Sequence, residues 1–151
     1  MCVILTAERD DLPEILRLQY LAYQSEAALF GSKDIPPLKQ TIEELTAEYE
    51  DGMILKAVNP QQSIIGSVRA RAQNGTVLIG KLMVHPDYRR RGLGSKLLEE
   101  IAQKFPEQRC ELFTSTRSKD NILLYQRRGY RQFKTETVDE KLQFVYMEKY
   151  K

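Results

Sequence analysis

The stretch of chain best suited to chemistry runs from Leu82 to Ser95, where a short basic loop and two glycines precede an amphipathic segment. A helix N-terminus carries four unpartnered N–H groups, which together with the helix dipole attract an anion. Gly92 and Gly94 have no side chains, so phosphate oxygens can approach the backbone there. Positive charge comes from three consecutive arginines, Arg89, Arg90 and Arg91. The pattern suits a pyrophosphate, and on these residues alone a helix cap beside a solvated basic loop is an equal alternative.

Two nucleotide-binding motifs can be tested against this region, and neither fits. The dinucleotide motif G-x-G-x-x-G would need its third glycine at Leu97. The stretch Gly75–Lys81 does match G-x-x-x-x-G-K, but Leu82 replaces the Ser or Thr that holds magnesium. Its interior, Thr-Val-Leu-Ile, is typical of a strand and not of a phosphate loop. We interpret the second match as chance.

The cysteines and the histidine do not form a metal-binding pattern. Cys2, Cys110 and His85 are far apart in the sequence and make no C-x-x-C or Cys/His cluster, so we expect no metal site. Cys110 is expected to be a buried strand residue, because no motif supports its pairing with His85 as a nucleophile. Two cysteines give no disulfide framework, which favours a reducing compartment.

Composition bounds the class of protein. The 151 residues fit a single domain, residues 1–151. A net charge of +2 argues against general binding to nucleic acid, so such binding would need a local patch. No apolar run is long enough to span a membrane, and the N-terminus lacks the basic leader of a signal peptide. We therefore expect a cytoplasmic protein without membrane or nucleic-acid partners.

Periodicity and turn residues predict one order of elements: a strand, two helices, three strands, a helix, a strand, a helix and two strands. Capping-box patterns at Asp11–Glu14 and Thr41–Glu44 start the two N-terminal helices, and Gly52 is a C-cap. A loop is expected at Gly31–Pro37, and a hairpin turn at Asn74-Gly75. The remaining ranges are strands Val3–Leu5, Met53–Val58, Ser63–Ala72, Thr76–Val84, Cys110–Thr114, Tyr130–Thr137 and Leu142–Lys149, and helices Gly92–Phe105 and Asn121–Arg128.

Two blocks resemble one enzyme family. The stretch Val84–Gly94 resembles the acetyl-CoA motif of the GNAT superfamily of N-acetyltransferases, R-x-x-G-x-G/A preceded by a strand and V-x-P. Leu124–Tyr130 resembles the later L-Y-x-x-x-G-F/Y segment of the same family. The blocks come in the family's order and at its usual separation. The resemblance implies the GNAT fold, an α/β structure of α+β type in which helices flank a mainly antiparallel mixed sheet.

The same resemblance implies an activity and a site. The activity is transfer of the acetyl group of acetyl-CoA to a primary amine of a small molecule or peptide, by direct attack. Tyr125 would protonate the departing thiolate, since a phenol of pKa near 10 is protonated at neutral pH. The strand end at Leu82 would line the pantetheine arm, and the loop that follows would hold the pyrophosphate. The implied cofactor-binding residues are Leu82, Met83, Val84, Arg89, Arg90, Arg91, Gly92, Leu93, Gly94, Ser95, Ser118, Asn121 and Tyr125.

The chain departs from the family in two places. Many members have Asn where Ser118 stands here, and Asn121 follows one turn later. Many also have a Glu base on the strand before the motif, but Ile79–Leu82 contains no carboxylate. His85 could serve by its ordinary pKa, although a lone loop histidine is more often structural. The alternative is therefore a non-catalytic module that binds acyl-CoA or nucleic acid through the Arg89–Gly94 loop.

The acceptor side is harder to predict. In this family the two N-terminal helices and their loop cover it, which corresponds to Tyr20–Tyr49. The acidic and aromatic residues of this segment would suit a cationic amine, but they are equally typical of solvated helix faces, which we favour. They are Tyr20, Tyr23, Glu26, Phe30, Asp34, Glu43 and Glu44. The identity of the amine and the oligomeric state, monomer or homodimer, stay open.

Overall fold

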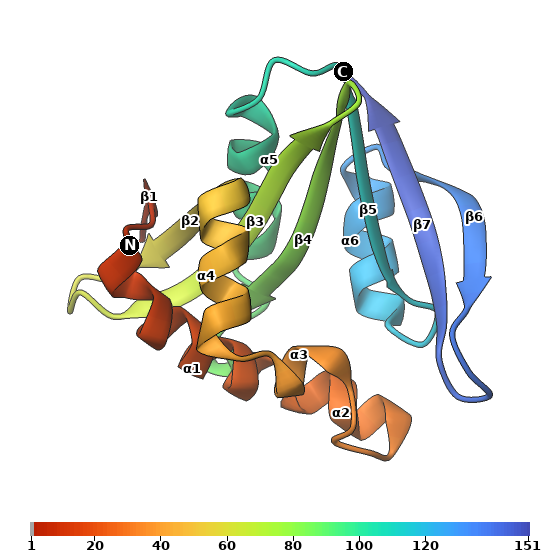
Figure 1. Cartoon of the computed structure of the whole chain (residues 1–151), viewed down its shortest axis with the longest axis horizontal. Coiled ribbons are helices and arrows are strands. Elements are labelled where there is room, and N and C mark those ends of the chain that lie inside the picture. The colour runs from red at the N-terminus through yellow and green to blue at the C-terminus, as the bar shows by residue number, and fades with distance from the viewer. Residues whose placement is uncertain (1) are drawn as a thin grey trace.

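The computed structural model describes residues 2–151, which form a seven-stranded sheet with helices on both faces (Figure 1). The strands are β1 (Val3–Thr6), β2 (Met53–Val58), β3 (Ile64–Gln73), β4 (Thr76–Val84), β5 (Arg109–Ser115), β6 (Arg131–Thr137) and β7 (Gln143–Tyr150). The α-helices are α1 (Leu12–Ala22), α2 (Gln24–Phe30), α3 (Pro36–Lys39), α4 (Ile42–Asp51), α5 (Leu93–Gln103) and α6 (Lys119–Arg127). Two short 3-10 helices are η1 (Arg9–Asp11) and η2 (Pro86–Tyr88).

The sheet is antiparallel except at its centre. Its strand order is β1-β2-β3-β4-β5-β7-β6, and β4 pairs in parallel with β5. That pairing covers only Thr76–Leu78 against Arg109–Glu111, after which the two strands diverge (Figure 1). From Ile79 to Val84 the β5-facing edge of β4 therefore has no strand partner, and its backbone groups are available to other molecules.

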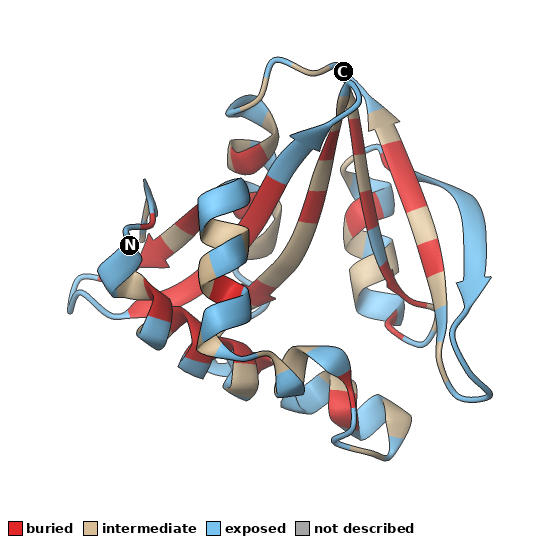
Figure 2. Cartoon of the chain, in the orientation of Figure 1, coloured by how far each residue is buried: buried red, intermediate tan, exposed pale blue. Residues whose placement is uncertain are grey.

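Two hydrophobic cores, one on each face, hold the sheet. Side chains of successive strand residues point to opposite faces, so Ile54 belongs to the core that includes α1 and α4, and the adjacent Leu55 belongs to the core that includes α5 and α6. Leu97 of α5 and Ile15 of α1 are fully buried, and full burial of such a side chain contributes about 1.5–3 kcal/mol. Figure 2 shows buried residues concentrated along the central strands, whereas β6 at the edge is exposed throughout.

The start of α1 differs from the prediction. The capping box lies at Glu8–Asp11, around η1, and not at Asp11–Glu14. Asp11 accepts a hydrogen bond from the Glu8 N–H at 2.8 Å and forms an ion pair with Lys56 at 2.8 Å. Glu14 instead accepts from the backbone N–H of Ile64 at 2.9 Å, which ties α1 to β3. Both carboxylates are therefore engaged by other groups and do not form the predicted capping box.

The expected loop at Gly31–Pro37 is also partly wrong, because Pro36 and Pro37 begin α3. Proline at the first helical positions lacks only an N–H that would be unpaired anyway, and its fixed φ fits a helix. The predicted capping box at Thr41–Glu44 is confirmed by both of its hydrogen bonds, 3.1 and 2.9 Å long. Gly52 does follow α4, but with extended backbone, and a Cβ there would lie 2.3 Å from the carbonyl oxygen of Ala70. Close packing against β3 therefore requires this glycine.

The second half of the chain follows the prediction closely. Asn74 and Gly75 both have positive φ, 52° and 78°, as the predicted hairpin turn requires. The stretch Thr76–Val84 is a strand, which agrees with the interpretation of the G-x-x-x-x-G-K match as chance. Helix α5 starts one residue later than predicted, and α6 two residues earlier.

Candidate active site

The divergence of β4 and β5 opens into two adjoining cavities. The first, which we call the α5 cavity, has a volume of about 1010 Å³ and lies between the end of β4, the N-terminus of α5 and the start of α6. The second, the sheet cavity, has a volume of about 830 Å³ and is lined mainly by α2–α4, β3, β4, β5 and β7. Four residues line both, Tyr23, Glu26, Leu82 and Asn121. Two ligands could therefore meet at these four side chains.

The backbone forms the anion-binding part of the α5 cavity. Gly92 is the N-cap of α5 with φ 80°, and no side chain caps the helix. The first hydrogen bond into Gly92 comes from the N–H of Lys96, so the N–H groups of residues 93–95 have no partner within the helix. Gly94 also has a packing role, because a Cβ there would lie 3.4 Å from Leu124 Cδ2 of α6. The predicted pyrophosphate site thus has the geometry of an anion cradle.

The three consecutive arginines lie in different environments. Arg89 donates to the carbonyl oxygens of Ala22 at 2.8 Å and Val84 at 3.2 Å, which fastens the loop to the end of α1. Arg91 lies 5.2 Å above the ring of Tyr88 and does not line the cavity. Arg90 lines the cavity, has φ 64°, and makes no ion pair or side-chain hydrogen bond within residues 2–151. Arg90 is therefore the arginine best placed to meet an anion.

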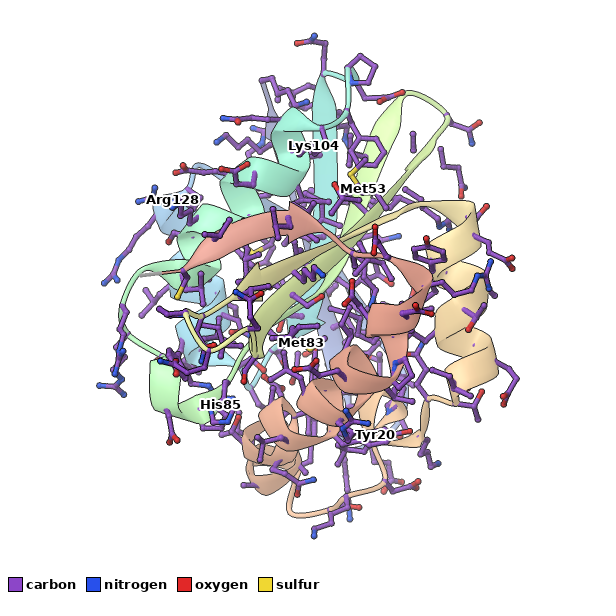
Figure 3. The ribbon with its side chains drawn as sticks, turned by 90° about the vertical axis from the view of Figure 1, so that its left-hand side faces the viewer. Tyr20, Met53, Met83, His85, Lys104 and Arg128 are labelled. Carbon is purple, nitrogen blue, oxygen red and sulfur yellow. The ribbon has the colours of Figure 1, made fainter. Side chains whose placement is uncertain are left out.

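The end of β4 supplies the floor of the α5 cavity. Leu82, Met83 and Val84 all line it. Figure 3 shows Met83 inside the molecule and His85 near the surface, beside the loop that leads to α5. The His85 Nδ1 accepts a hydrogen bond from the Asp87 N–H at 3.1 Å, so His85 caps η2, and it lines neither cavity. The structure therefore gives no support to His85 as a base.

Tyr125 forms part of the wall of the sheet cavity. It is 6% exposed, its ring lies 6.2 Å from that of Tyr130, and its hydroxyl makes no hydrogen bond within residues 2–151. Burial raises the pKa of Tyr125 far above that of a free phenol, so the hydroxyl keeps its proton at neutral pH. Asn121 lies four residues earlier on α6 and lines both cavities, which places Tyr125 beside their junction. A free, protonated donor thus faces the point where two ligands would meet.

Glu26 of α2 carries the negative charge at this junction. Its carboxylate accepts hydrogen bonds from the Ser118 hydroxyl at 2.6 and 2.7 Å and from the Asn121 side chain at 3.2 Å. Asn121 also donates to the Thr114 hydroxyl at 3.3 Å. The predicted cofactor residues Ser118 and Asn121 therefore meet a carboxylate from the other side of the opening. Neutral donors alone solvate this charge, since no ion pair involves Glu26 in the described chain.

The N-terminal segment contributes more to the site than the sequence suggested. Tyr23, Glu26 and Phe30 line the sheet cavity, so for them a solvated helix face was the wrong interpretation. Their spacing of three and four residues is the helical signal that could have separated them from the rest. Tyr20 donates to the Gln40 carbonyl, and the other three members of the set do not line the cavity.

None of the other charged residues that line the sheet cavity was singled out from the sequence, and Arg69 and Lys81 are the two cations that lie furthest from water. Arg69 of β3 is 5% exposed and pairs with Glu48 at 2.7 Å. Lys81 of β4 is half-buried and stands on a bulge with φ 50°. An arginine directly after the apolar Val68, within the buried part of β3, was the available signal for the first. Nothing local in the sequence marks the second.

Neither a metal centre nor a membrane-spanning helix is found in the described chain. Within residues 2–151, no group of three or more His, Cys, Asp or Glu side chains could hold a metal ion. None of the helices there combines the length and apolarity needed to cross a bilayer. Cys110 is a buried, free strand residue, as predicted.

A mixed sheet that splays at its centre, with a glycine-rich helix start in the opening, defines an acyltransferase of the GNAT class. The family described as "Acetyltransferase (GNAT) domain" matches residues 21–151. The chain therefore belongs to the GNAT acetyltransferases, a family of acetyl-CoA-dependent acyltransferases. The match confirms both the predicted family and the predicted fold.

One curated relative and several solved structures are similar to this chain, the structures in fold. The UPF0157 protein YqkA of Bacillus subtilis is 28% identical over 126 residues, which are 83% of this chain and 35% of that protein. The chain thus spans about a third of the length of this relative. The ribosomal-protein-S18-alanine N-acetyltransferase of Escherichia coli superimposes with a TM-score of 0.81 at 18% identity, over 99% of this chain and 94% of that chain. The PaiA N-acetyltransferase of Thermoplasma acidophilum, in complex with coenzyme A, superimposes with a TM-score of 0.80 at 20% identity, over 100% of this chain and 99% of that chain.

Proposed function

We propose that this chain transfers the acetyl group of acetyl-CoA to a primary amine of a small molecule or peptide, by direct attack. The observation that carries the proposal is that the two cavities adjoin and share four lining residues. The α5 cavity contains the anion cradle, and the Glu26 carboxylate and the Tyr125 phenol lie where the sheet cavity meets it. A non-catalytic acyl-CoA carrier would need only the first of these cavities.

The α5 cavity has the features that acetyl-CoA needs. The free N–H groups at the start of α5, with Arg90, would hold the pyrophosphate. The unpaired edge of β4 from Ile79 to Val84 offers backbone donors and acceptors to the amides of the pantetheine arm. When bound, acetyl-CoA supplies a thioester that the amine attacks, giving an amide and the CoA thiol. One N–H of β4 would polarise the thioester carbonyl.

Two side chains at the junction would move the protons. Tyr125 would give its proton to the departing sulfur, since burial keeps the phenol protonated. Glu26 would attract the ammonium group of the acceptor and take the first proton that nitrogen loses. An ammonium nitrogen loses two protons on becoming an amide, one before it attacks and one from the tetrahedral intermediate. Glu26 would take the first and pass it to solvent, the departing sulfur would gain one from Tyr125, and the second proton lost by nitrogen would restore the Tyr125 phenol, so the exchange balances with one proton released. Glu26 would fill the role for which β4 offers no carboxylate.

Nucleic-acid binding through the Arg89–Gly94 loop is the weaker alternative. Arg89 is engaged with backbone carbonyls and Arg91 with Tyr88, which leaves one arginine of three for a phosphate backbone. Binding of that kind would weaken steeply with added salt, and coenzyme A would not compete with it.

Isothermal titration followed by a turnover assay tests the proposed function. Acetyl-CoA and CoA are expected to bind more tightly than ATP or NAD, and a library of primary amines should then release free thiol from acetyl-CoA. Equal binding of all four nucleotides would remove the cofactor assignment. Tight acetyl-CoA binding without thiol release from any amine would favour the non-catalytic module.

A further inference from the structure

The charged side chains that line the sheet cavity are all partnered except one. Glu48 pairs with Arg69 at 2.7 Å, Asp51 with Arg71 at 3.8 Å, and Glu111 with Arg109 at 2.9 Å. Glu26 is held by the Ser118 and Asn121 side chains. Within residues 2–151, Lys81 has no ion pair and its ammonium group no hydrogen bond. The cavity thus contains one cation without a counter-ion.

The backbone places Lys81 there at a cost. The register of β4 shifts between Gly80 and Met83, so Val68 of β3 faces two residues of β4, Lys81 and Leu82. Lys81 takes φ 50°, in the left-handed region that residues other than glycine rarely occupy. Bulges of this kind re-aim a side chain, and strained backbone concentrates at ligand sites. The neighbouring Leu82 lines both cavities, so Lys81 stands one residue from their junction.

The surroundings of Lys81 disfavour its charge. Burial lowers the pKa of Lys81, and the positive charge of Arg69 acts in the same direction. Glu48 opposes the shift, but its Oε2 already accepts hydrogen bonds from Arg69 at 2.7 Å and from Gln40 at 2.9 Å. A carboxylate from a ligand would stabilise the charged form of Lys81, because an opposite charge in direct contact favours an ammonium group removed from water.

We propose that Lys81 binds a carboxylate of the acceptor, and that the acceptor is an amine that also carries a carboxylate, as an amino acid does. The proposal rests on the proposed acetyl transfer for the orientation of the amine. Glu26 and Lys81 present opposite charges to one cavity, which complements a zwitterion whose ammonium lies at the junction. The volume of about 830 Å³ and the aromatic wall formed by Phe113, Phe144 and Tyr146 leave room for a side chain.

Matched acceptor pairs test the proposal. Each amino acid is compared with its carboxamide, which keeps the amine and the side chain but loses the negative charge. The wild type should prefer the carboxylate at least tenfold in kcat/KM, since the amide leaves Lys81 unpaired. In Lys81→Met the preference should fall to about onefold, chiefly through KM, and Lys81→Arg should retain part of it. Lys141→Met, at an exposed turn, is the control and should keep the full preference.

Stability provides a readout that does not depend on turnover. Met has a similar length without the charge, so Lys81→Met should raise Tm by about 2–4 °C, as removal of an unpaired buried charge predicts. Acetyl-CoA affinity, measured by titration, should stay within twofold of the wild type. A Tm that falls in Lys81→Met would contradict an unpaired ammonium.

Direct binding separates failure of this inference from failure of the proposed function. Amino acid and carboxamide are titrated into the CoA-bound protein, with no chemistry required. Tighter binding of the carboxylate that is lost in Lys81→Met supports the inference even if no amine is acetylated. Acetylation of both members of each pair with equal efficiency in the wild type would overturn it while leaving the acetyltransferase activity intact.

Discussion

The two cavities that meet at Glu26 are built in different ways. The α5 cavity consists largely of the contiguous stretches Leu82–Ser95 and Arg117–Arg127, and its anion cradle is made of backbone N–H groups. The sheet cavity takes side chains from four helices and four strands, with the buried Arg69 paired to the half-buried Glu48 among them. A backbone site tolerates many sequences, whereas a side-chain site depends on each residue. We therefore expect the first half to tolerate more substitutions than the second.

Loss of the Tyr125 hydroxyl should have the largest effect on turnover. Tyr125→Phe keeps the ring in the core, so acetyl-CoA binding and Tm should change little, while kcat falls roughly 10²-fold or more. The loss should shrink with acetyl donors whose leaving thiol is more acidic. Tyr130→Phe is the matched control, because Tyr130 packs in the same core but lines neither cavity. Equal kcat in wild type and Tyr125→Phe would return Tyr125 to a purely structural role.

A side chain added to the anion cradle should weaken binding of acetyl-CoA and leave binding of the amine unchanged. Gly92→Val should raise the KM for acetyl-CoA roughly tenfold or more, because it blocks phosphate approach, and Gly94→Val should act in the same direction. Gly92 has φ 80°, so strain of about 1–3 kcal/mol also lowers Tm. Gly75→Val carries similar strain at φ 78° in a remote hairpin and should lower Tm without changing KM. A normal KM in Gly92→Val would place the pyrophosphate elsewhere.

Removal of the charge of Glu26 should affect the acceptor half. Glu26→Gln keeps the shape but removes the charge that attracts the ammonium and the base that takes its proton. We therefore expect the KM for the amine to rise about tenfold, as for loss of a charge-assisted hydrogen bond, and kcat to fall as well. Initial rates at saturating acetyl-CoA measure this. Glu43→Gln, on an exposed part of α4, should behave as the wild type. An effect on acetyl-CoA binding larger than that on the amine would assign Glu26 to the cofactor half instead.

Substitution of single arginines in the loop should give the smallest effects on acetyl-CoA binding and should distinguish Arg90 from Arg91. Arg90→Ala should weaken acetyl-CoA binding roughly two- to fivefold, the range for an exposed charge at a helix terminus. Arg91→Ala, which loses only the contact with Tyr88, should bind acetyl-CoA as the wild type does. Titration of both variants at two salt concentrations measures the difference. If Arg91→Ala had the larger effect, the loop would have to adopt another arrangement with ligand bound.

Features that depend on neighbouring residues could be predicted from the sequence. The hairpin at Asn74-Gly75, the capping box at Thr41–Glu44 and the start of α5 follow from local backbone preferences, so they could be predicted. The residues proposed to bind the cofactor could be named from the sequence for the same reason, because they belong to short continuous stretches.

The proposed acceptor half depends on contacts that form only in the folded protein. Glu26 meets Ser118 across 92 positions of sequence, and Arg69 meets Glu48 across 21, by contacts that no local pattern encodes. Glu14 was taken from its predicted cap by the backbone of Ile64, fifty residues away. Lys81 faces the cavity because a bulge in β4 re-aims it, and the bulge exists only in the pairing with β3. Burial penalises unpaired ions, and the fold determines which charged side chains lie close enough to pair.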